Sequence, residues 1–132
     1  MRGGERGQSL AEFALVVPIF LVLIFAIMDF GMGFHAYITV TNSAREGARL
    51  GAIGAPAASI VQRVQDTSES LDQAKLTVSV TNAQGTPGES VVVDVDYQYD
   101  LITPLAGLLQ FISGDTIGPT LTFSSTADMR LE

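Results

Sequence analysis

An uncharged apolar run from Phe13 to Met28 constrains the fold of this chain more than any other feature. Counted with the apolar residues from Phe30 to Phe34, it reaches about 22 residues, which as an α-helix would measure about 33 Å and would cross a bilayer. The run is longer than the apolar region of a cleaved secretory signal, and no small-x-small cleavage site follows it closely. We therefore predict a retained transmembrane helix over residues 8–34.

The seven residues before this helix, MRGGERG, are short, polar and net basic, and they match the n-region of an export signal. Residues 1–7 are accordingly predicted to be a leader peptide. With Arg2 and Arg6 ahead of the apolar run, the positive-inside rule predicts a cytoplasmic N-terminus and an outward-facing remainder.

Two acids and a proline mark the apolar helix. Glu12 stands at its start, and a carboxylate there must find a cation, a proton or a partner subunit before it can be buried. Asp29 follows 17 residues later and is interpreted as an outer-interface residue beside Gly31 and Gly33, which would loosen the helix. Pro18 removes one backbone hydrogen bond, so it predicts a bend and favours packed neighbours.

A second helical pattern covers residues 35–53 and carries a row of small residues, Ser43, Gly47 and Gly51, at every fourth position. Such a row permits close approach of helices in a membrane or a bundle. It equally suits a helix that lies flat on a sheet, and the sequence leaves both interpretations open. Gly51 and Gly54 are expected to end the helix.

The remainder predicts an extracytoplasmic head over residues 35–132 that includes this helix. An amphipathic helix is expected over residues 57–74, and alternation of apolar and polar residues predicts strands near residues 76–81, 91–99 and 120–129. The predicted fold class is α+β: a long N-terminal transmembrane helix, with a second helix packed on a small antiparallel sheet of about three strands.

Two further clusters have a structural interpretation that outweighs a functional one. Asp94, Asp96 and Asp100 have the spacing of a strand and not of a calcium loop, so they are expected to solvate the outer face of the sheet. A dense apolar patch near residue 108 is expected to be core, although its exposure would favour a partner surface; it comprises Leu105, Leu108, Leu109, Phe111 and Ile112.

Composition narrows the function classes. The net charge of -7 lies mainly after residue 50, and an acidic domain argues against a nucleic-acid partner. The chain has no cysteine and one histidine, His35, so no metal site, cofactor or catalytic triad is predicted and we expect no enzyme. A small hydrolase would need a nucleophile and base pair that the sequence does not offer.

The segment from Gly7 to Phe13, GQSLAEF, resembles the cleavage site of type IV pilin-like proteins, and most closely that of TadE-like pseudopilins, minor pilins of tight-adherence (Tad, type IVc) pili. The shared features are a basic leader that ends in glycine, a glutamate soon after the cleavage point, an adjacent aromatic residue, a proline in the apolar helix and the run NSAREGAR at residues 42–49.

This resemblance implies that a prepilin peptidase cuts between Gly7 and Gln8. It implies that Glu12, with Phe13 and Pro18 on the same helix, contacts other subunits, and that Glu12 neutralises the new terminal amine of an adjoining one. The implied partners are other pilin or pseudopilin subunits and inner-membrane pilus assembly proteins, at the bacterial inner membrane or in the pilus. The alternative is a generic signal-anchored extracytoplasmic binding domain outside any pilus.

Overall fold

The computed structural model describes residues 3–114, 116 and 118–132, with side chains described from Gly7 onward, so Met1 and Arg2 of the predicted leader lie outside the described residues. The chain divides into two compact units. We call Met1–Met32 with Leu101–Pro119 the anchor unit, and Gly33–Asp100 with Thr120–Glu132 the head unit. Residues 101–119, which the sequence placed in the head, thus group with the N-terminal helix.

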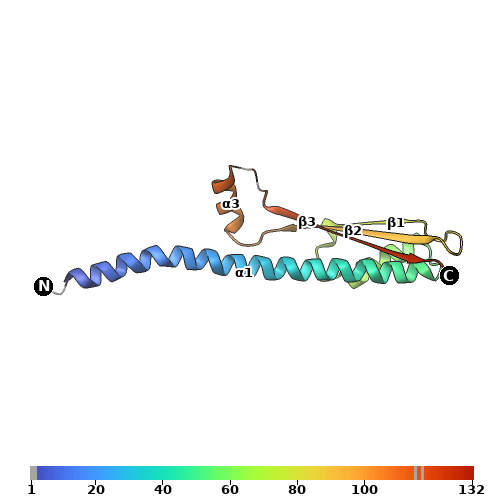
Figure 1. Cartoon of the computed structure of the whole chain (residues 1–132), viewed down its shortest axis with the longest axis horizontal. Coiled ribbons are helices and arrows are strands. Elements are labelled where there is room, and N and C mark those ends of the chain that lie inside the picture. The colour runs from blue at the N-terminus through green and yellow to red at the C-terminus, as the bar shows by residue number, and fades with distance from the viewer. Residues whose placement is uncertain (1–2, 115, 117) are drawn as a thin grey trace. The chain divides into compact units, whose positions relative to one another are not determined.

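Helix α1 runs without interruption from Gly3 to Ala52, a length of 50 residues (Figure 1). It joins the two helices predicted from the sequence and continues through Pro18, Gly31 and Gly33. The bend at Pro18 stays a prediction. Gly54, with a φ of 80°, follows the end of α1 and adopts the left-handed conformation that glycine tolerates best.

The first half of α1 is apolar on every side. Most large apolar side chains from Leu10 to Met28 are exposed, as expected for a helix surrounded by lipid or by other helices and not for one packed in a soluble core. Among the described residues, α1 is the one helix long and apolar enough to cross a membrane, so by length and composition it is a candidate membrane span.

The anchor unit also contains a short helix, α3, from Leu105 to Ser113. Pro104 precedes it, where the missing backbone N–H costs nothing. Gly114 ends it with a φ of 58°, the left-handed conformation common after a helix.

The head unit contains a three-stranded antiparallel sheet of β1 (Leu76–Thr81), β2 (Ser90–Asp100) and β3 (Thr120–Arg130). The strand order is β1-β2-β3, so β2, whose alternate residues are buried, lies in the centre. The register pairs Val95 with Val78 on one side and with Ser125 on the other. The predicted α+β class and the three strands are confirmed.

Helix α2 spans Ala57–Thr67 and ends earlier than the predicted residue 74. Ser68 is the C-cap residue of this helix, with a non-helical φ of -113°. It is fully buried, and its hydroxyl donates a 2.6 Å hydrogen bond to the carbonyl of Val64, one of the carbonyls that the end of a helix leaves without a helical partner. A short 3-10 helix, η1 (Gln73–Lys75), then leads into β1.

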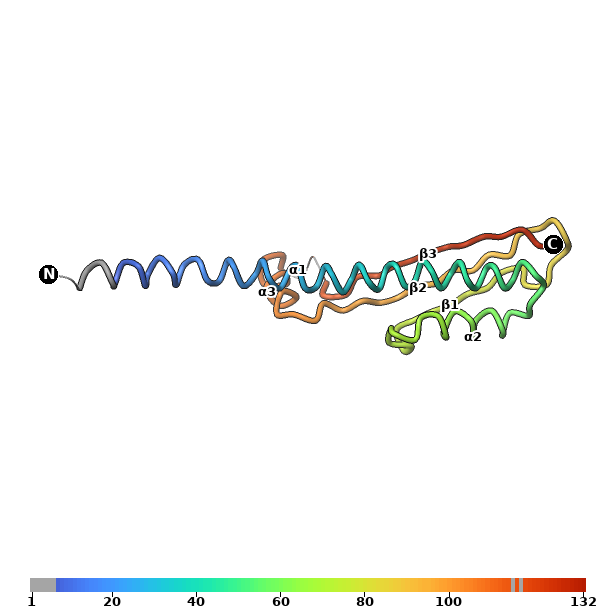
Figure 2. The backbone as a smooth tube through the Cα atoms, turned by 90° about the horizontal axis from the view of Figure 1, so that it is seen from below, coloured from blue at the N-terminus to red at the C-terminus, as the bar shows by residue number. Residues whose placement is uncertain are grey.

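Helix α2 and the second half of α1 cover the same face of the sheet (Figures 1 and 2). The core of the head lies between these two helices and the sheet. Its apolar side chains come from alternate residues of β2 and from one stripe of each helix. The buried members include Ala36, Val40, Ala44, Ala48, Ile60, Val64, Val91, Val93, Val95, Tyr97 and Tyr99.

Candidate functional site

The predicted processing site lies on the exposed surface of α1. Gly7 and Gln8 are both exposed, and a Cβ atom placed on Gly7 would meet nothing within 4 Å. The Nε2 of Gln8 donates a 3.1 Å hydrogen bond to Oε1 of Glu12, one helical turn later. Nothing in the described structure therefore covers the Gly7–Gln8 bond.

Glu12 is exposed and directly precedes the apolar surface of α1. Its polar contact among the described side chains is the neutral amide of Gln8. Phe13 follows and is 66% exposed, and Pro18, five residues further on, is also exposed. These residues belong to a surface that a membrane or another chain can cover.

The row Ser43, Gly47 and Gly51 lies on the buried face of α1 in the head unit. A Cβ atom on Gly47 would come within 2.6 Å of Cγ2 of Val64 on α2, and one on Gly51 within 2.9 Å of the methyl groups of Val91 on β2. The Ser43 hydroxyl donates to the carbonyl of Val40, which satisfies it inside the core. Of the two interpretations left open, the structure shows a helix that lies close on a sheet.

Gly33 gives α1 a further point of close approach, at an aromatic cluster. A Cβ atom there would lie 3.4 Å from Cε1 of Tyr99 on β2. The rings of Tyr99 and Phe123 are 5.9 Å apart, and Tyr37 meets Phe123 edge-on at 6.1 Å. Gly33 therefore packs against rings within an unbroken helix and does not loosen it.

Asp29 has partners that the sequence did not reveal. Its side chain is almost completely buried, with 3% exposed. Oδ1 accepts a 2.9 Å hydrogen bond from the backbone N–H of Ile102, and Oδ2 accepts one from the hydroxyl of Thr103. The carboxylate thus holds the loop before α3 against α1, within the anchor unit.

The apolar patch on α3 is not core, so that interpretation of the sequence is wrong. Phe111 is 88% exposed, Ile112 is 71% exposed and Leu108 is 37% exposed, while Leu105 and Leu109 are only half-buried. A helix that presents this much apolar surface must be covered by something outside the chain fold or by lipid.

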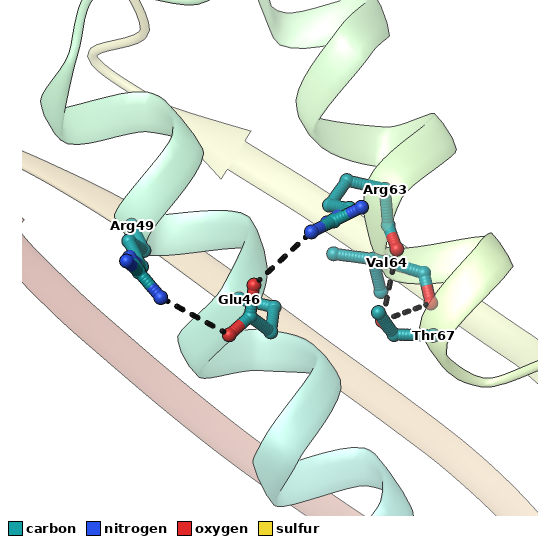
Figure 3. Close-up of polar contacts among 5 residues, drawn as sticks. All are labelled: Glu46, Arg49, Arg63, Val64 and Thr67. Carbon is teal, nitrogen blue, oxygen red and sulfur yellow. Dashed lines mark hydrogen bonds and ion pairs between the residues drawn. The ribbon is translucent and has the colours of Figure 1, made fainter.

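Charged pairs in the head have structural roles. Glu46 pairs with Arg49 at 3.8 Å, as its i,i+3 spacing favours, and with Arg63 of α2 at 3.5 Å (Figure 3). All three side chains are well exposed, so each pair contributes little, about 0 to 1 kcal/mol. The pair with Arg63 nevertheless joins α1 to α2.

A second polar group joins the end of η1 to the ends of β2 and β3. Nζ of Lys75 lies 2.8 Å from Oδ2 of Asp100, and the Thr120 hydroxyl donates to Oδ1 of the same carboxylate at 2.5 Å. The hydrogen bonds from Lys75 and Thr120 lower the pKa of Asp100, and the hydrogen bond to Asp100 raises the pKa of Lys75.

The remaining acids of β2 lie on the outer face of the sheet, as the strand spacing predicted. Asp96 is exposed, and Asp94 accepts a 2.5 Å hydrogen bond from the hydroxyl of Thr126 across the strand pair. The described residues contain no group of three or more His, Cys, Asp or Glu side chains placed to hold a metal ion.

Comparison with known families connects these observations. Residues 7–49 match the family model of TadE-like proteins, so this segment is TadE-like and the resemblance found in the sequence is confirmed. The match begins at Gly7 and includes Glu12 and Pro18. It ends at Arg49, in the part of α1 that belongs to the head unit. No significant match was found among curated proteins or solved structures.

Proposed function

We propose that this TadE-like chain is a pseudopilin, or minor pilin, that takes part in the assembly of a Tad-type adhesion pilus. It is a non-enzymatic, single-span inner-membrane protein with a cytoplasmic N-terminus and an acidic head outside. A prepilin peptidase cleaves it between Gly7 and Gln8. The observation that carries the proposal is the position of Glu12, an exposed acid at the start of an exposed apolar helix inside the TadE-like segment.

The surroundings of Gly7 support cleavage. A peptidase needs its substrate extended in a cleft, and here the bond lies in the exposed N-terminal part of α1. Glycine in a helix costs about 1 kcal/mol relative to alanine, so this turn is easier to unwind than its neighbours. The open space around the Cα of Gly7 leaves the bond accessible on that side.

The environment of Glu12 supports a role after cleavage. Burying a carboxylate among apolar helices is unfavourable unless a cation or several hydrogen bonds compensate for its lost hydration. In the uncleaved chain its contact is the neutral side chain of Gln8. Cleavage creates an α-amine that carries a positive charge through much of the neutral range, and the amine of an adjoining subunit supplies the missing cation.

The apolar surface of α1 supports packing with other subunits. Residues on all sides of the helix are exposed, including Leu15 at 72% and Ile19 at 67%. Neighbouring helices can therefore cover the same surface that lipid covers in the isolated chain. The carbonyl freed by Pro18 then finds hydrogen-bond donors among these neighbours. Partners of this kind are other pilin or pseudopilin subunits and inner-membrane pilus assembly proteins.

A substitution at Glu12 tests the proposal. Glu12→Ala should insert into the membrane as wild type does, because the apolar run is unchanged. Co-purification with the other pilus subunits should fall at least about tenfold, since losing one partner of a buried charge pair costs several kcal/mol. Pilus formation, counted by electron microscopy of cells, should fall with it.

The matched control is Glu69→Ala, which removes an exposed acid from the head. It should assemble normally, which would show that the loss is specific to the position of the charge. Normal pilus formation by the Glu12→Ala variant would contradict the proposed pairing.

A further inference from the structure

Helix α3 presents an apolar surface that the proposed function does not use. From Leu101 to Gly114 the chain carries no charged residue. Phe111 is the most exposed of its large side chains. Such a surface in water would be an aggregation liability, so its covering needs an explanation.

The exposed side of α3 is apolar. Leu108, Phe111 and Ile112 are exposed at i, i+3 and i+4, so they lie on one helical face. The polar residues Gln110 and Ser113 are half-buried, together with Leu105 and Leu109. A helix that turns only apolar side chains away from the rest of the chain suits an apolar medium beside it.

The contacts of Asp29 fix where along α1 this helix is attached. The loop before α3 donates two hydrogen bonds to Asp29. Asp29 lies about 24 Å along the helix axis from Phe13, the first residue of the apolar run. Beyond Asp29, Phe30 and Met32 are still apolar and exposed, at 76% and 52%. The attachment point therefore lies inside the outer end of the apolar span, at the depth of the outer membrane boundary.

The backbone of the attached segment suits this depth. The N–H of Ile102 is bonded to Asp29, and the N–H of Leu101 donates to the carbonyl of Pro119 at 3.0 Å. The N–H of Leu108 donates to the carbonyl of Pro104 within α3. Polar backbone groups near hydrocarbon must be paired in this way, because lipid offers no hydrogen bonds.

The direction of α3 completes the argument. In Figure 1 it runs crosswise to the part of α1 in the same unit, and Figure 2 views it nearly end-on. When α1 crosses a bilayer, a helix crosswise to it lies along the membrane plane. We propose that α3 is a second membrane contact of this chain, an interfacial helix whose Leu108–Phe111–Ile112 face inserts among the acyl chains of the outer leaflet.

Lipid is the occupant that the surroundings favour. The exposed face of α3 is continuous in its chemistry with the neighbouring surface of α1, where Ala26, Ile27, Phe30 and Gly31 line a shallow apolar hollow. Lipid covers that surface of α1 in the membrane-anchored chain wherever no other subunit packs on it. The inference rests on the membrane anchoring in the proposed function and is independent of cleavage and of pilus assembly.

Site-directed spin labelling of the full chain tests the inference, and the absence of cysteine makes single labels unambiguous. Nitroxides are placed at Phe111→Cys and Ile112→Cys, in vesicles of phosphatidylethanolamine and phosphatidylglycerol. Their collision rates with oxygen and with a water-soluble nickel chelate report depth. Both labels should be several-fold less accessible to nickel than a label at Ser124→Cys on β3, and more accessible to oxygen.

One further label serves as a control: Phe20→Cys should report the middle of the apolar span. If Phe20→Cys is in lipid while Phe111→Cys and Ile112→Cys are as wet as Ser124→Cys, the inference is overturned and the anchor stands.

Shielding of the α3 labels from both reagents would also overturn it, because a second protein surface would then cover the helix. A Phe20→Cys label that is wet would instead count against the anchoring on which the proposed function depends.

Discussion

Three glycines set how closely α1 approaches the rest of the head. Gly33 faces the aromatic rings of Tyr99 and Phe123, and Gly47 and Gly51 face valine methyl groups on α2 and β2. The sequence shows small residues at regular spacing, which predicts that another element packs closely against this helix. It does not show whether the approaching element is a membrane helix or a sheet, because both accept the same spacing.

Gly47→Val tests this packing. The first carbon added would lie 2.6 Å from Cγ2 of Val64, so α2 or β2 must shift. Overpacking of this kind costs about 1 to 3 kcal/mol, and the midpoint of thermal unfolding of the head, followed by circular dichroism in detergent, should fall by several degrees.

Gly31→Val is the matched control, because nothing lies within 4 Å of a Cβ atom at that position of the same helix. It should leave the unfolding midpoint unchanged. Equal midpoints for Gly47→Val and wild type would show that α1 does not lie as close to α2 as described.

Asp29 shows where residue-level prediction stops. Its position near the outer end of the apolar run indicates an acid that needs a partner, and the sequence predicts that position in the membrane. Its partners, Ile102 and Thr103, lie 73 and 74 residues later. No periodicity connects residues at that separation, so only the folded chain reveals the contact.

At the scale of elements, the periodicity of the sequence predicts which segments are strands or helices better than it predicts the residues at which they end. The three strands alternate apolar and polar residues and were predicted with nearly the observed bounds. Helix α2 ends at Thr67, and Ser68 caps it inside the core. The apolar stripe continues to Leu71, so it does not show where the helix stops.

Helix α3 shows a second limit at this scale. An apolar stripe identifies which face avoids water and does not identify what covers that face. The sequence favoured core because cores are the commonest cover, yet Phe111 and Ile112 are exposed. A membrane beside the fold supplies an alternative cover that no pattern within α3 distinguishes from protein.

The ion pair that joins the ends of η1, β2 and β3 has a defined pH dependence. The pKa of Asp100 lies below its ordinary value of 3.8, so the pair is fully formed above that value and is lost as pH falls through the folded-state pKa. The pKa of Lys75 lies above 10.5, so its contribution is present below that pH and is lost as pH rises further.

We therefore expect the difference in unfolding midpoint between wild type and Asp100→Asn to be constant from about pH 5 to pH 9 and to shrink below about pH 4. The effect is small, because both groups are exposed, and added salt should reduce it. Asp96→Asn, on the same strand, is the control. A difference that persists unchanged at pH 2 would contradict the assignment to this carboxylate.

At the scale of the whole molecule, the chain is two units that share one helix. The division after Met32 falls inside α1, close to the end of the apolar run, and the transmembrane boundary at residue 34 stays a prediction. No pattern in the sequence indicates that residues 101–119 belong with the N-terminal helix. In chain order they lie between β2 and β3, and they return to α1 through the contacts of Asp29.

The proposed function depends most directly on the N-terminus of the mature protein. Intact-mass and N-terminal peptide mass spectrometry of the chain isolated from its native membrane should show a start at Gln8, and Gly7→Leu should leave the leader attached. Glu12 gains a cationic partner only if that cut is made. An intact Met1, or a cut after Ala57, would contradict the account and would favour a generic signal-anchored domain.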